Sequence, residues 1–350
     1  MNEQPSDNPH RILSSEKVEI KPLFKEQYQK LLGPRYDEFM DYSFRYLRKC
    51  VRVNTLKIDV PTLQKRLEDQ GWILTPVPWC KEGFFVEGHK DFHRFDIGNL
   101  VEHDLGYFYV QEAASMLPPV VLFSDVQDKV ANTDDQVPAS LFVVLDLCAA
   151  PGSKTSQLAQ YMNNEGLLIA NDVDVSRLRP LSLNLQRMGV TNVLVTLGAF
   201  QRSKKSTKPR NPFGEEPFFD RILVDAPCSG TGTIRRSFKM LEMYSEGFVR
   251  RLVAIQKALI LNAFTLLKSG GTMVYSTCSQ EPSENEGVVS YLLEKQSSAK
   301  LLDIELDIKR SEPIMEFDGE TFNPEVKKCL RIYPQDNNSE GFFVAKIRKN

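Results

Sequence analysis

The sequence predicts an α/β protein with a doubly wound, mostly parallel sheet, preceded by a smaller α+β region. Short, nearly continuous apolar runs recur in the second part of the chain, a pattern typical of parallel strands buried on both faces. Helical patterns alternate with these runs, which implies right-handed crossovers within one sheet. The pattern changes near Gly106, and before that residue helices and strands are mixed. Sheets of this kind place their active sites at the carboxyl ends of the strands.

The predicted elements after Gly106 follow in order. Tyr107 begins a segment that leads into an apolar helix ending near Leu122, and the polar residues 124–140 are expected to form a surface loop. Strands are expected at 141–148, 167–170, 193–196, 221–225 and 272–275, with final strands at 330–333 and 341–347. Helices are expected between them at 153–163, 176–188 and 247–268.

The first third of the chain predicts a separate unit. Residues 1–20 are polar and are expected to form a flexible N-terminus. The following patterns predict helices within 23–50, a strand at 51–56, a short helix at 61–70 and extended segments over 72–86. We therefore predict a small N-terminal α+β domain over 21–104 and a catalytic domain over 105–350.

Composition narrows the class of protein. The 350 residues are 41% hydrophobic and 26% charged, as in an ordinary globular protein. No apolar run approaches the ~18 to 20 residues of a membrane span, and the first residues lack the features of a secretory signal, so we expect a cytoplasmic protein with no membrane partner. Six cysteines without a CxxC pair predict neither a metal site nor disulfides, and leave structural or catalytic roles.

Three basic clusters contrast with the net charge of −2, which argues against a protein that coats nucleic acid by charge alone. Each cluster contains no acidic residue and is either a phosphate-binding patch or a solvated face. The first cluster comprises Arg45, Arg48, Lys49, Arg52 and Lys57, the second Arg202, Lys204, Lys205, Lys208 and Arg210, and the third Arg235, Arg236 and Lys239.

The segment from Leu145 to Thr155, LDLCAAPGSKT, joins a predicted buried strand to a helix through small residues. Such a turn lets backbone N–H groups approach a ligand at the edge of the sheet. The spacing fits neither a Walker A loop nor a G-x-G-x-x-G turn. Asp172 ends the next strand, where a carboxylate suits ribose hydroxyls. Together these residues indicate a nucleoside cofactor, and the alternative is a solvated Asp at a strand end.

Two further strands end in cysteine-containing turns. ILVDAPCSGTG carries Asp225 and Cys228, and MVYSTCS carries Cys278. A single cysteine after a strand is more often structural, but two of them at the same edge of one sheet favour catalysis.

Thiols suit the methylation of carbon 5 of cytosine, which is a poor nucleophile. Addition of a thiolate to carbon 6 activates carbon 5, and a nearby acid such as Asp225 is suited to hydrogen-bond the ring nitrogen N3. A second thiol is a plausible helper when the first is eliminated. This chemistry leaves open which of the two cysteines attacks.

DLCAAPGSKT, DAPCSGTG and YSTCS, in this order and spacing, resemble the Fmu/Sun/NSUN family of S-adenosylmethionine-dependent RNA 5-methylcytosine methyltransferases. The resemblance extends to RVNT at Arg52, YVQEAASM at Tyr109, RIYP at Arg331 and GFFVAK at Gly341, and so covers roughly residues 45–350. It implies a Rossmann-like class I methyltransferase fold.

Carried over by position, the resemblance implies that Cys278 is the nucleophile and that Cys228 promotes release of the product. Asp225 would lie beside the cytosine and contact the cofactor, and Asp172 would bind the ribose. The segment expected to hold S-adenosylmethionine comprises Cys148, Ala149, Ala150, Pro151, Gly152, Ser153 and Lys154. RNA is the implied partner, gripped by the N-terminal domain with its target base flipped into the cleft.

One position departs from the family pattern. The family usually has an adenine-contacting Asp after the third strand, whereas this chain has Gly198 there. Gly198 cannot supply that hydrogen bond, so a residue of the inserted loop 201–219 is a candidate replacement.

Alternatives remain at this point. An inactive RNA-binding homologue would not need Cys228, Cys278 and Asp225, and a methyltransferase for exocyclic amines would carry Pro-Pro-aromatic after its Asp or Asn instead of Ala-Pro-Cys. The compact length resembles the archaeal-type tRNA methyltransferases of the family, with ribosomal RNA as the second candidate substrate. We expect a monomer.

Overall fold

The computed structural model describes residues 12, 18–91, 96–132, 142–198 and 216–350. Most of the predicted flexible N-terminus, the whole second basic cluster and most of the loop 201–219 lie outside these residues. In the described part of the chain, no helix combines the length and the apolar character needed to cross a membrane.

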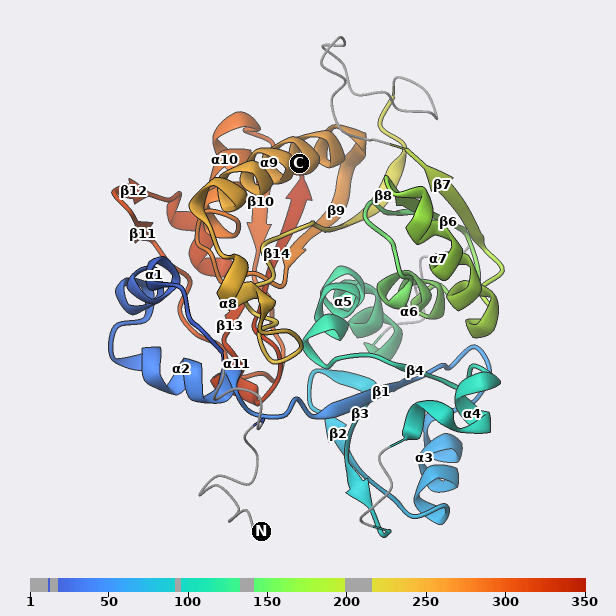
Figure 1. Cartoon of the computed structure of the whole chain (residues 1–350). Helices are drawn as coiled ribbons and strands as arrows, with labels where there is room; N and C mark the ends of the chain where they lie inside the picture. The colour runs from blue at the N-terminus through green and yellow to red at the C-terminus, as the bar shows by residue number, and fades with distance from the viewer. Residues whose placement is uncertain (1–11, 13–17, 92–95, 133–141, 199–215) are drawn as a thin grey trace, which may run out of the picture.

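The predicted doubly wound, mostly parallel sheet is confirmed (Figure 1). Its strand order is β10-β14-β9-β8-β5-β6-β7, with β13 paired to β14. The five strands from β9 to β7 are parallel, and β14 runs antiparallel to β9 at one side. The strands are β5 (Val143–Asp146), β6 (Leu167–Asp172), β7 (Val193–Leu197), β8 (Phe219–Asp225), β9 (Leu267–Thr277), β10 (Ala299–Leu302), β13 (Leu330–Ile332) and β14 (Phe342–Lys349).

Helices cover both faces of this sheet because successive side chains of each strand point to opposite sides. On β9, Tyr275 packs in the core with α9 (Glu246–Leu266) and α10 (Glu286–Lys295). The neighbouring Val274 packs in the core with α5 (Leu117–Asn132) and α6 (Ser153–Tyr161). Helix α7 (Val175–Met188) packs on Ala170 of β6. Because both faces of each strand are buried, successive residues are apolar, which explains the continuous apolar runs in the sequence.

A second, four-stranded antiparallel sheet has the order β2-β3-β1-β4. It comprises β1 (Lys49–Val53), β2 (Trp72–Val77), β3 (Cys80–His89) and β4 (Phe108–Val110), with α3 (Val60–Asp69) and α4 (Val101–Asp104) beside it (Figure 1). Strand β4 follows residue 104 yet completes this sheet by pairing with β1. The division of the chain into domains at 104/105 stays a prediction.

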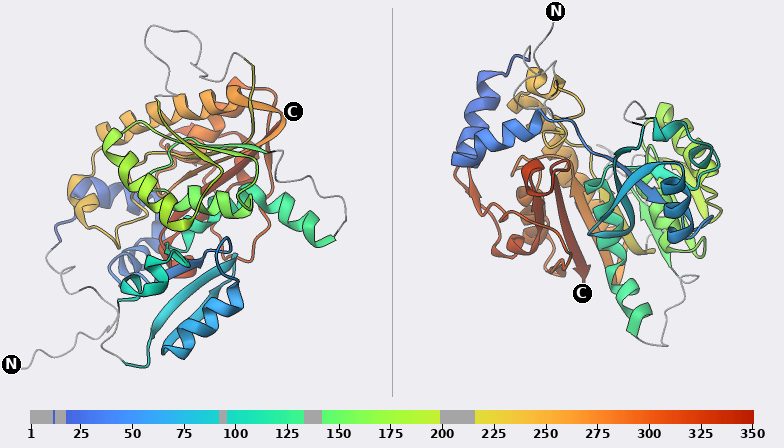
Figure 2. Two further views of the ribbon diagram at one scale, coloured as in Figure 1. Left: turned by 90° about the vertical axis from the view of Figure 1, so that its right-hand side faces the viewer. Right: turned by 90° about the horizontal axis from the view of Figure 1, so that it is seen from below.

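The first helices lie apart from this small sheet. Helices α1 (Pro22–Leu32) and α2 (Tyr36–Ser43) lie beside α8 (Lys239–Met243) and β13, whereas the four-stranded sheet lies under α5 and α6 (Figures 1 and 2). Phe24, Tyr28 and Phe39 are fully buried against side chains that include Tyr244 and Tyr333. The N-terminal region therefore packs on the rest of the protein at two separate sites. Helices α1 and α2 pack near α8 and β13, and the four-stranded sheet packs near α5 and α6.

The predicted helix end near Leu122 and the predicted loop from 124 are wrong, because α5 continues to Asn132. Arg221 on β8 donates to the carbonyl of Leu122 and forms a two-point ion pair with Asp125 at 2.9 and 3.0 Å. Lys346 on β14 donates to Ser124 at 2.8 Å. These long-range contacts give polar residues buried partners, so the helix extends through a segment whose sequence is typical of a loop.

Several short elements are absent from the sequence prediction. The segment from Tyr107 forms β4 and a 3₁₀ helix (Ala114–Met116) before it leads into α5. Further unpredicted elements include α4, α8, α10, α11 (Pro334–Asn337), β10, β11 (Glu316–Phe317) and β12 (Glu320–Thr321).

Candidate active site

The carboxyl ends of β5, β6, β8 and β9 meet at one edge of the sheet, where a pocket of about 230 Å³ opens. Parallel strands point their C-terminal loops the same way, so residues distant in the sequence converge there. The residues that line the pocket are Leu147, Cys148, Ala150, Asn171, Asp172, Val173, Arg177, Asp225, Ala226, Pro227, Cys228, Leu259 and Cys278. The structure therefore brings together both predicted cysteines and both predicted acids.

Cys228 and Cys278 lie in the turns after β8 and β9, and their sulfur atoms are 3.3 Å apart. Either sulfur can donate this hydrogen bond. With Cys228 as the donor, the bond lowers the pKa of Cys278; burial and the charge of Asp225 oppose this shift, and the Lys154 ammonium supports it. The same hydrogen bond and burial raise the pKa of Cys228. Of the two, Cys278 is the better placed to be a thiolate, which is the nucleophilic form of cysteine.

Lys154 and Asp225 form an ion pair beside the thiols, with Nζ and Oδ2 2.7 Å apart. Ser276 donates to the other oxygen of Asp225 at 2.8 Å, and Lys154 also donates to Ser115 at 3.0 Å. Burial lowers the pKa of Lys154, but the attraction of Asp225 outweighs burial and the net shift is upward. The pair therefore presents a fixed cation and a fixed carboxylate to the pocket region.

Asp172 lies at the end of β6 with its carboxylate in the pocket. Its oxygens accept hydrogen bonds from the backbone N–H groups of Ala150 at 3.2 Å and Asp174 at 3.1 Å. Arg177 lies 3.4 Å from Oδ2. Each carboxylate oxygen has two lone pairs, so capacity remains for further donors such as ribose hydroxyls. The acid, the small-residue turn and the neighbouring Cys148 and Ala150 fit the chemistry of S-adenosylmethionine.

Only part of the predicted cofactor-binding segment lines the pocket. Cys148 and Ala150 line the pocket, whereas Ala149, Pro151, Gly152 and Ser153 do not. Gly152 has a φ of +102°, and a Cβ there would lie 3.0 Å from Leu181 of α7. Ser153 offers its carbonyl to Arg52 at 2.9 Å. Lys154 pairs with Asp225 next to the thiols, and its contact with the cofactor stays a prediction.

Asp146 is fully buried behind the pocket at the end of β5. Thr155 donates to its Oδ2 at 2.7 Å, while Oδ1 has no hydrogen-bond partner among the described residues. Burial raises the pKa of Asp146 to about 7, and the charge of Asp225 adds to the shift. Gly198, where the family has an Asp, follows β7 and donates its N–H to the carbonyl of Asp172 at 3.2 Å.

Two residues of the basic clusters are wrong as phosphate contacts because they are buried. Arg52 is fully buried and donates to Ser153 and to Ser156 at 2.8 Å. Arg235 is 5% exposed and donates to the carbonyls of Arg45, Tyr46 and Ser339. Sequence charge alone does not reveal that backbone carbonyls, rather than phosphates, face these guanidinium groups.

Three members of the first cluster border an open groove, whereas Lys57 donates to the carbonyls of Leu105 and Arg187, both at 2.8 Å. Arg45, Arg48 and Lys49 line a hollow of about 960 Å³ together with the exposed Tyr46. Arg45 pairs with Asp41 at 2.5 Å, and Arg48 pairs with Glu87. A mixture of basic groups and an exposed aromatic ring is compatible with binding of single-stranded nucleic acid.

Sequence reasoning missed three side chains at or behind the pocket. Asn171 and Arg177 line it, and Glu284 accepts hydrogen bonds from the turns that carry the two cysteines. Asn171 and Arg177 lie close to Asp172 in the sequence, so the predicted end of the strand could have indicated that they lie near the pocket. Glu284 stands at the start of a helical pattern, where acidic residues are common for other reasons, so no signal distinguished it.

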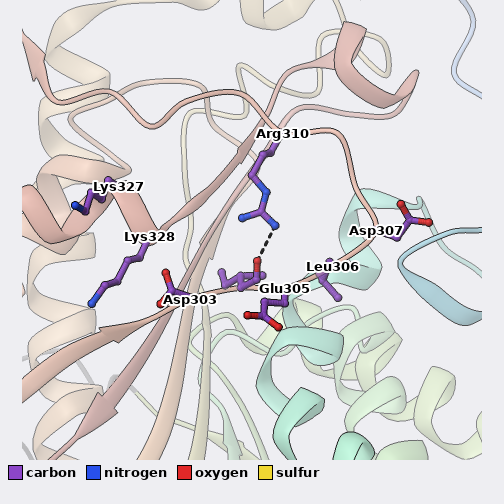
Figure 3. A pocket seen from close by; sticks show the side chains of 8 residues that line it. Asp303, Glu305, Leu306, Asp307, Arg310, Lys327 and Lys328 are labelled. Atoms are coloured by element: carbon purple, nitrogen blue, oxygen red, sulfur yellow. Dashed lines mark hydrogen bonds between the residues drawn. The ribbon is translucent and has the colours of Figure 1, made fainter.

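A different hollow, of about 660 Å³, is lined by charged side chains that include Asp303, Arg310 and Lys328 (Figure 3). Arg310 donates to the carbonyl of Ile304 at 2.6 Å. None of its lining residues belongs to the thiol pocket, and none of them is a cysteine. The chemistry of the side chains therefore identifies the smaller pocket as the candidate active site.

The fold places the chain among the Rossmann-like methyltransferases. It superposes on the crystal structure of a methyltransferase homolog protein from Pyrococcus horikoshii with a TM-score of 0.78, at 36% identity over 96% of this chain and 97% of that chain. The NSun6 structure from Pyrococcus horikoshii gives a TM-score of 0.72 over 94% of this chain and 98% of that chain, and at 24% identity it supports the fold alone.

Residues 137–348 match the family model described as 16S rRNA methyltransferase RsmB/F, and residues 20–113 match the N-terminal domain of 16S rRNA methyltransferase RsmF. The chain belongs to the RsmB/F (Fmu/Sun) family of RNA methyltransferases. This confirms the family predicted from the motifs.

Two kinds of relative illustrate the range of the family. The chain is 43% identical to the tRNA (cytosine(49)-C(5))-methyltransferase of Pyrococcus abyssi, over 93% of this chain and 99% of that protein. It is 40% identical to ribosomal RNA small subunit methyltransferase F of Shewanella oneidensis, over 89% of this chain. The chain spans only 60% of the length of that bacterial relative.

Proposed function

We propose that the protein transfers a methyl group from S-adenosylmethionine to carbon 5 of a cytosine in RNA, through a covalent adduct with Cys278. The observation that carries the proposal is the 3.3 Å separation of two sulfur atoms beside an ion pair and a pocket suited to a nucleoside. Methyl transfer to an exocyclic amine requires no thiol. A pair of thiols at the site therefore favours carbon methylation.

In the proposed reaction, the Cys278 thiolate forms a bond to carbon 6 of the base, and the electron pair of the 5,6 double bond activates carbon 5. The Lys154–Asp225 pair is placed to hold N3 and the neighbouring polar atoms of the ring while charge develops there. S-adenosylmethionine supplies the methyl group when bound. The carbon 5 proton then leaves and the bond to Cys278 breaks, which restores the double bond.

Cys228 is assigned to this last stage. Its raised pKa keeps a proton on the sulfur, so it can donate a hydrogen bond to the departing Cys278 thiolate. Asp172, Cys148 and Ala150 are assigned to the cofactor, with Asp172 at the ribose. The contribution of Ala149, Pro151, Gly152 and Ser153 would then be to shape the turn and the start of α6.

Transfer RNA is the favoured substrate. The relative named as a tRNA (cytosine(49)-C(5))-methyltransferase aligns over 99% of its length, whereas the relatives named as ribosomal RNA methyltransferase F extend well beyond the aligned part. Ribosomal RNA is the second candidate because the family models carry that name. We further propose that residues 21–104 bind the RNA, and that a monomer works in the cytoplasm, where these RNAs are present.

Bisulfite sequencing of total RNA from a strain lacking the gene tests the proposal. We expect one or more cytosines of tRNA to lose protection in that strain and to regain it when the wild-type gene is restored, but not with a Cys278→Ala gene. Loss of protection in ribosomal RNA would transfer the assignment to that substrate. Unchanged protection of every cytosine would contradict cytosine methylation.

A further inference from the structure

Glu284 is fully buried in the segment between β9 and α10 and accepts hydrogen bonds on both carboxylate oxygens. Oε1 accepts from the N–H of Ser229 at 2.9 Å and from the amide of Gln256 at 2.8 Å. Oε2 accepts from the hydroxyl of Ser279 at 2.5 Å and from the hydroxyl of Ser229. A buried carboxylate is tolerated when several donors face it, as here.

The donors belong to the two turns of the thiol pair. Ser229 directly follows Cys228, and Ser279 directly follows Cys278. Their hydroxyl oxygens are 3.0 Å apart, although they are separated by 50 residues in the sequence. Gly232 adds a backbone bond to the carbonyl of Cys278 at 2.8 Å. Glu284 therefore joins the turn after β8 to the turn after β9 at the residues next to the cysteines, and Thr231 joins them further along by accepting from the N–H of Gln280 at 2.9 Å.

If Glu284 served packing alone, a neutral side chain would be more favourable at this buried position than a carboxylate. The negative charge of Glu284 raises the pKa of both thiols, which opposes formation of the thiolate. Its presence therefore has a cost for the chemistry as well as a desolvation cost. The carboxylate fixes the relative position of the two turns, because one planar group accepts hydrogen bonds from both of them.

We infer that Glu284 is a positioning residue that fixes the separation and orientation of the Cys228 and Cys278 sulfur atoms. Its role in catalysis rests on the proposed function, but the geometric role does not depend on RNA. Without Glu284, the hydroxyls of Ser229 and Ser279 lose their shared acceptor, and the contacts that remain between the two turns, from Gly232 and Thr231, lie beyond the cysteines. A displacement of about 1 Å at reacting atoms can cost on the order of 100-fold in rate.

A bifunctional thiol reagent measures the geometry directly. Dibromobimane links two neighbouring thiols when each thiolate displaces one bromide, which forms two carbon–sulfur bonds. Peptide mass spectrometry then gives the fraction of Cys228 linked to Cys278 rather than singly alkylated. We expect efficient linking in the wild type and at least a severalfold lower linked fraction in Glu284→Ala. Glu284→Gln should be intermediate, because its amide oxygen can still accept from Ser229 and Gln256.

Asp336 provides a matched control. It is also a buried carboxylate with several donors, accepting from the N–H of Tyr333 at 2.8 Å and the hydroxyl of Ser311 at 2.7 Å, but it contacts neither cysteine turn. Asp336→Ala should lower the thermal unfolding temperature and leave the linked fraction unchanged. If both Glu284 variants keep the wild-type linked fraction, the positioning role is wrong; Glu284→Gln alone decides if Glu284→Ala does not fold.

Steady-state kinetics supply the second measurement. Glu284→Ala should lower kcat by about 10- to 100-fold, with small changes in the KM for RNA and in the affinity for S-adenosylmethionine, and Glu284→Gln should restore part of kcat. A loss confined to KM would overturn the inference. If the wild type methylates no cytosine but the linked fractions still differ as expected, the proposed function fails while the positioning role holds.

Discussion

Cys228 and Cys278 share one hydrogen bond, yet their pKa values shift in opposite directions. The residue types and their spacing predicted that both would lie at the active edge of the sheet, and the structure places both there. They did not distinguish the attacking thiol from its helper, and only the family resemblance assigned the roles. A hydrogen bond donated by Cys228 to Cys278 is compatible with the same assignment.

Replacement of each thiol should give a different product. Cys278→Ala should abolish methylation and leave no covalent complex, because no bond to carbon 6 can form. Cys228→Ala should still form that bond but release the RNA slowly. Methylated RNA would then remain attached to the protein as a band that survives denaturing gel electrophoresis with labelled substrate.

Cys329→Ala is the control for loss of a buried sulfur, since Cys329 is 2% exposed and lies outside the pocket. It should turn over normally and trap no RNA. A trapped complex in Cys278→Ala, with none in Cys228→Ala, would reverse the assignment of the two roles.

Asp172 gives a test of the cofactor site. Asp172→Ala removes an acceptor from the pocket and should weaken S-adenosylmethionine binding by roughly 1–3 kcal/mol, the usual effect of leaving a buried polar partner unpaired. Calorimetric titration measures this. Glu316→Ala, a change at an exposed acid on β11, should leave the affinity unaltered. An unaltered affinity in Asp172→Ala as well would remove Asp172 from the site.

At the scale of elements, the long periodic segments followed from the sequence and the polar ones did not. Helix α7 and strand β6 begin and end within two residues of the predicted bounds, because the spacing of apolar residues within each segment determines its burial. Helix α5 extends beyond its predicted end because Arg221 and Lys346, distant in the sequence, supply partners for its polar residues. Glu284 was not predicted for the same reason, since Ser229 and Gln256, two of its three partners, are distant in the sequence.

Arg45 and Arg48 lie in the link between α2 and β1, and Lys49 is the first residue of β1; all three border the groove, unlike the buried Arg52. Replacing Arg45, Arg48 and Lys49 by Ala should weaken RNA binding and flatten its dependence on salt. If all three contact phosphates of a single strand, the slope of log affinity against log salt should fall by about 2. Filter binding across a range of salt concentrations measures the slope.

A triple variant of Arg250, Lys268 and Lys328 removes the same charge outside residues 21–104. These residues are also engaged in ion pairs, with Glu246, Asp220 and Glu325 respectively. The control should keep the wild-type slope. Equal slopes in the two triple variants would show that the α2–β1 link does not bind phosphates.

At the scale of the whole molecule, buried acids should make stability depend on pH. Glu281 lies beside Tyr28 of α1 and Tyr244, and burial raises its pKa to about 7. The folded state therefore favours the protonated acid, and the stability it contributes is present below a pH of about 4.5 and declines as the pH rises to about 7. The decline has an upper limit of about 1.4 kcal/mol per pH unit.

Glu281→Gln should remove that part of the pH dependence, because the amide stays neutral. Urea unfolding at pH values from about 5 to 8 should show a smaller loss of unfolding free energy with rising pH in the variant than in the wild type. Glu320→Gln, at an exposed acid, should follow the wild type. Parallel curves for wild type and Glu281→Gln would mean that Glu281 is already ionised in the folded protein.

The packing of α1 and α2 on Tyr244 and Tyr333 has a consequence for biosynthesis. These helices are made before their partners, because Tyr244 follows Phe44 by about 200 residues and Tyr333 follows it by about 290. At about 5–20 residues per second, the interval before Tyr244 is made lasts on the order of 10–40 s. During that interval, Phe24, Tyr28 and Phe39 lack most of the surface that buries them in the finished protein. The nascent chain therefore exposes an aromatic segment that is expected to bind a chaperone during synthesis.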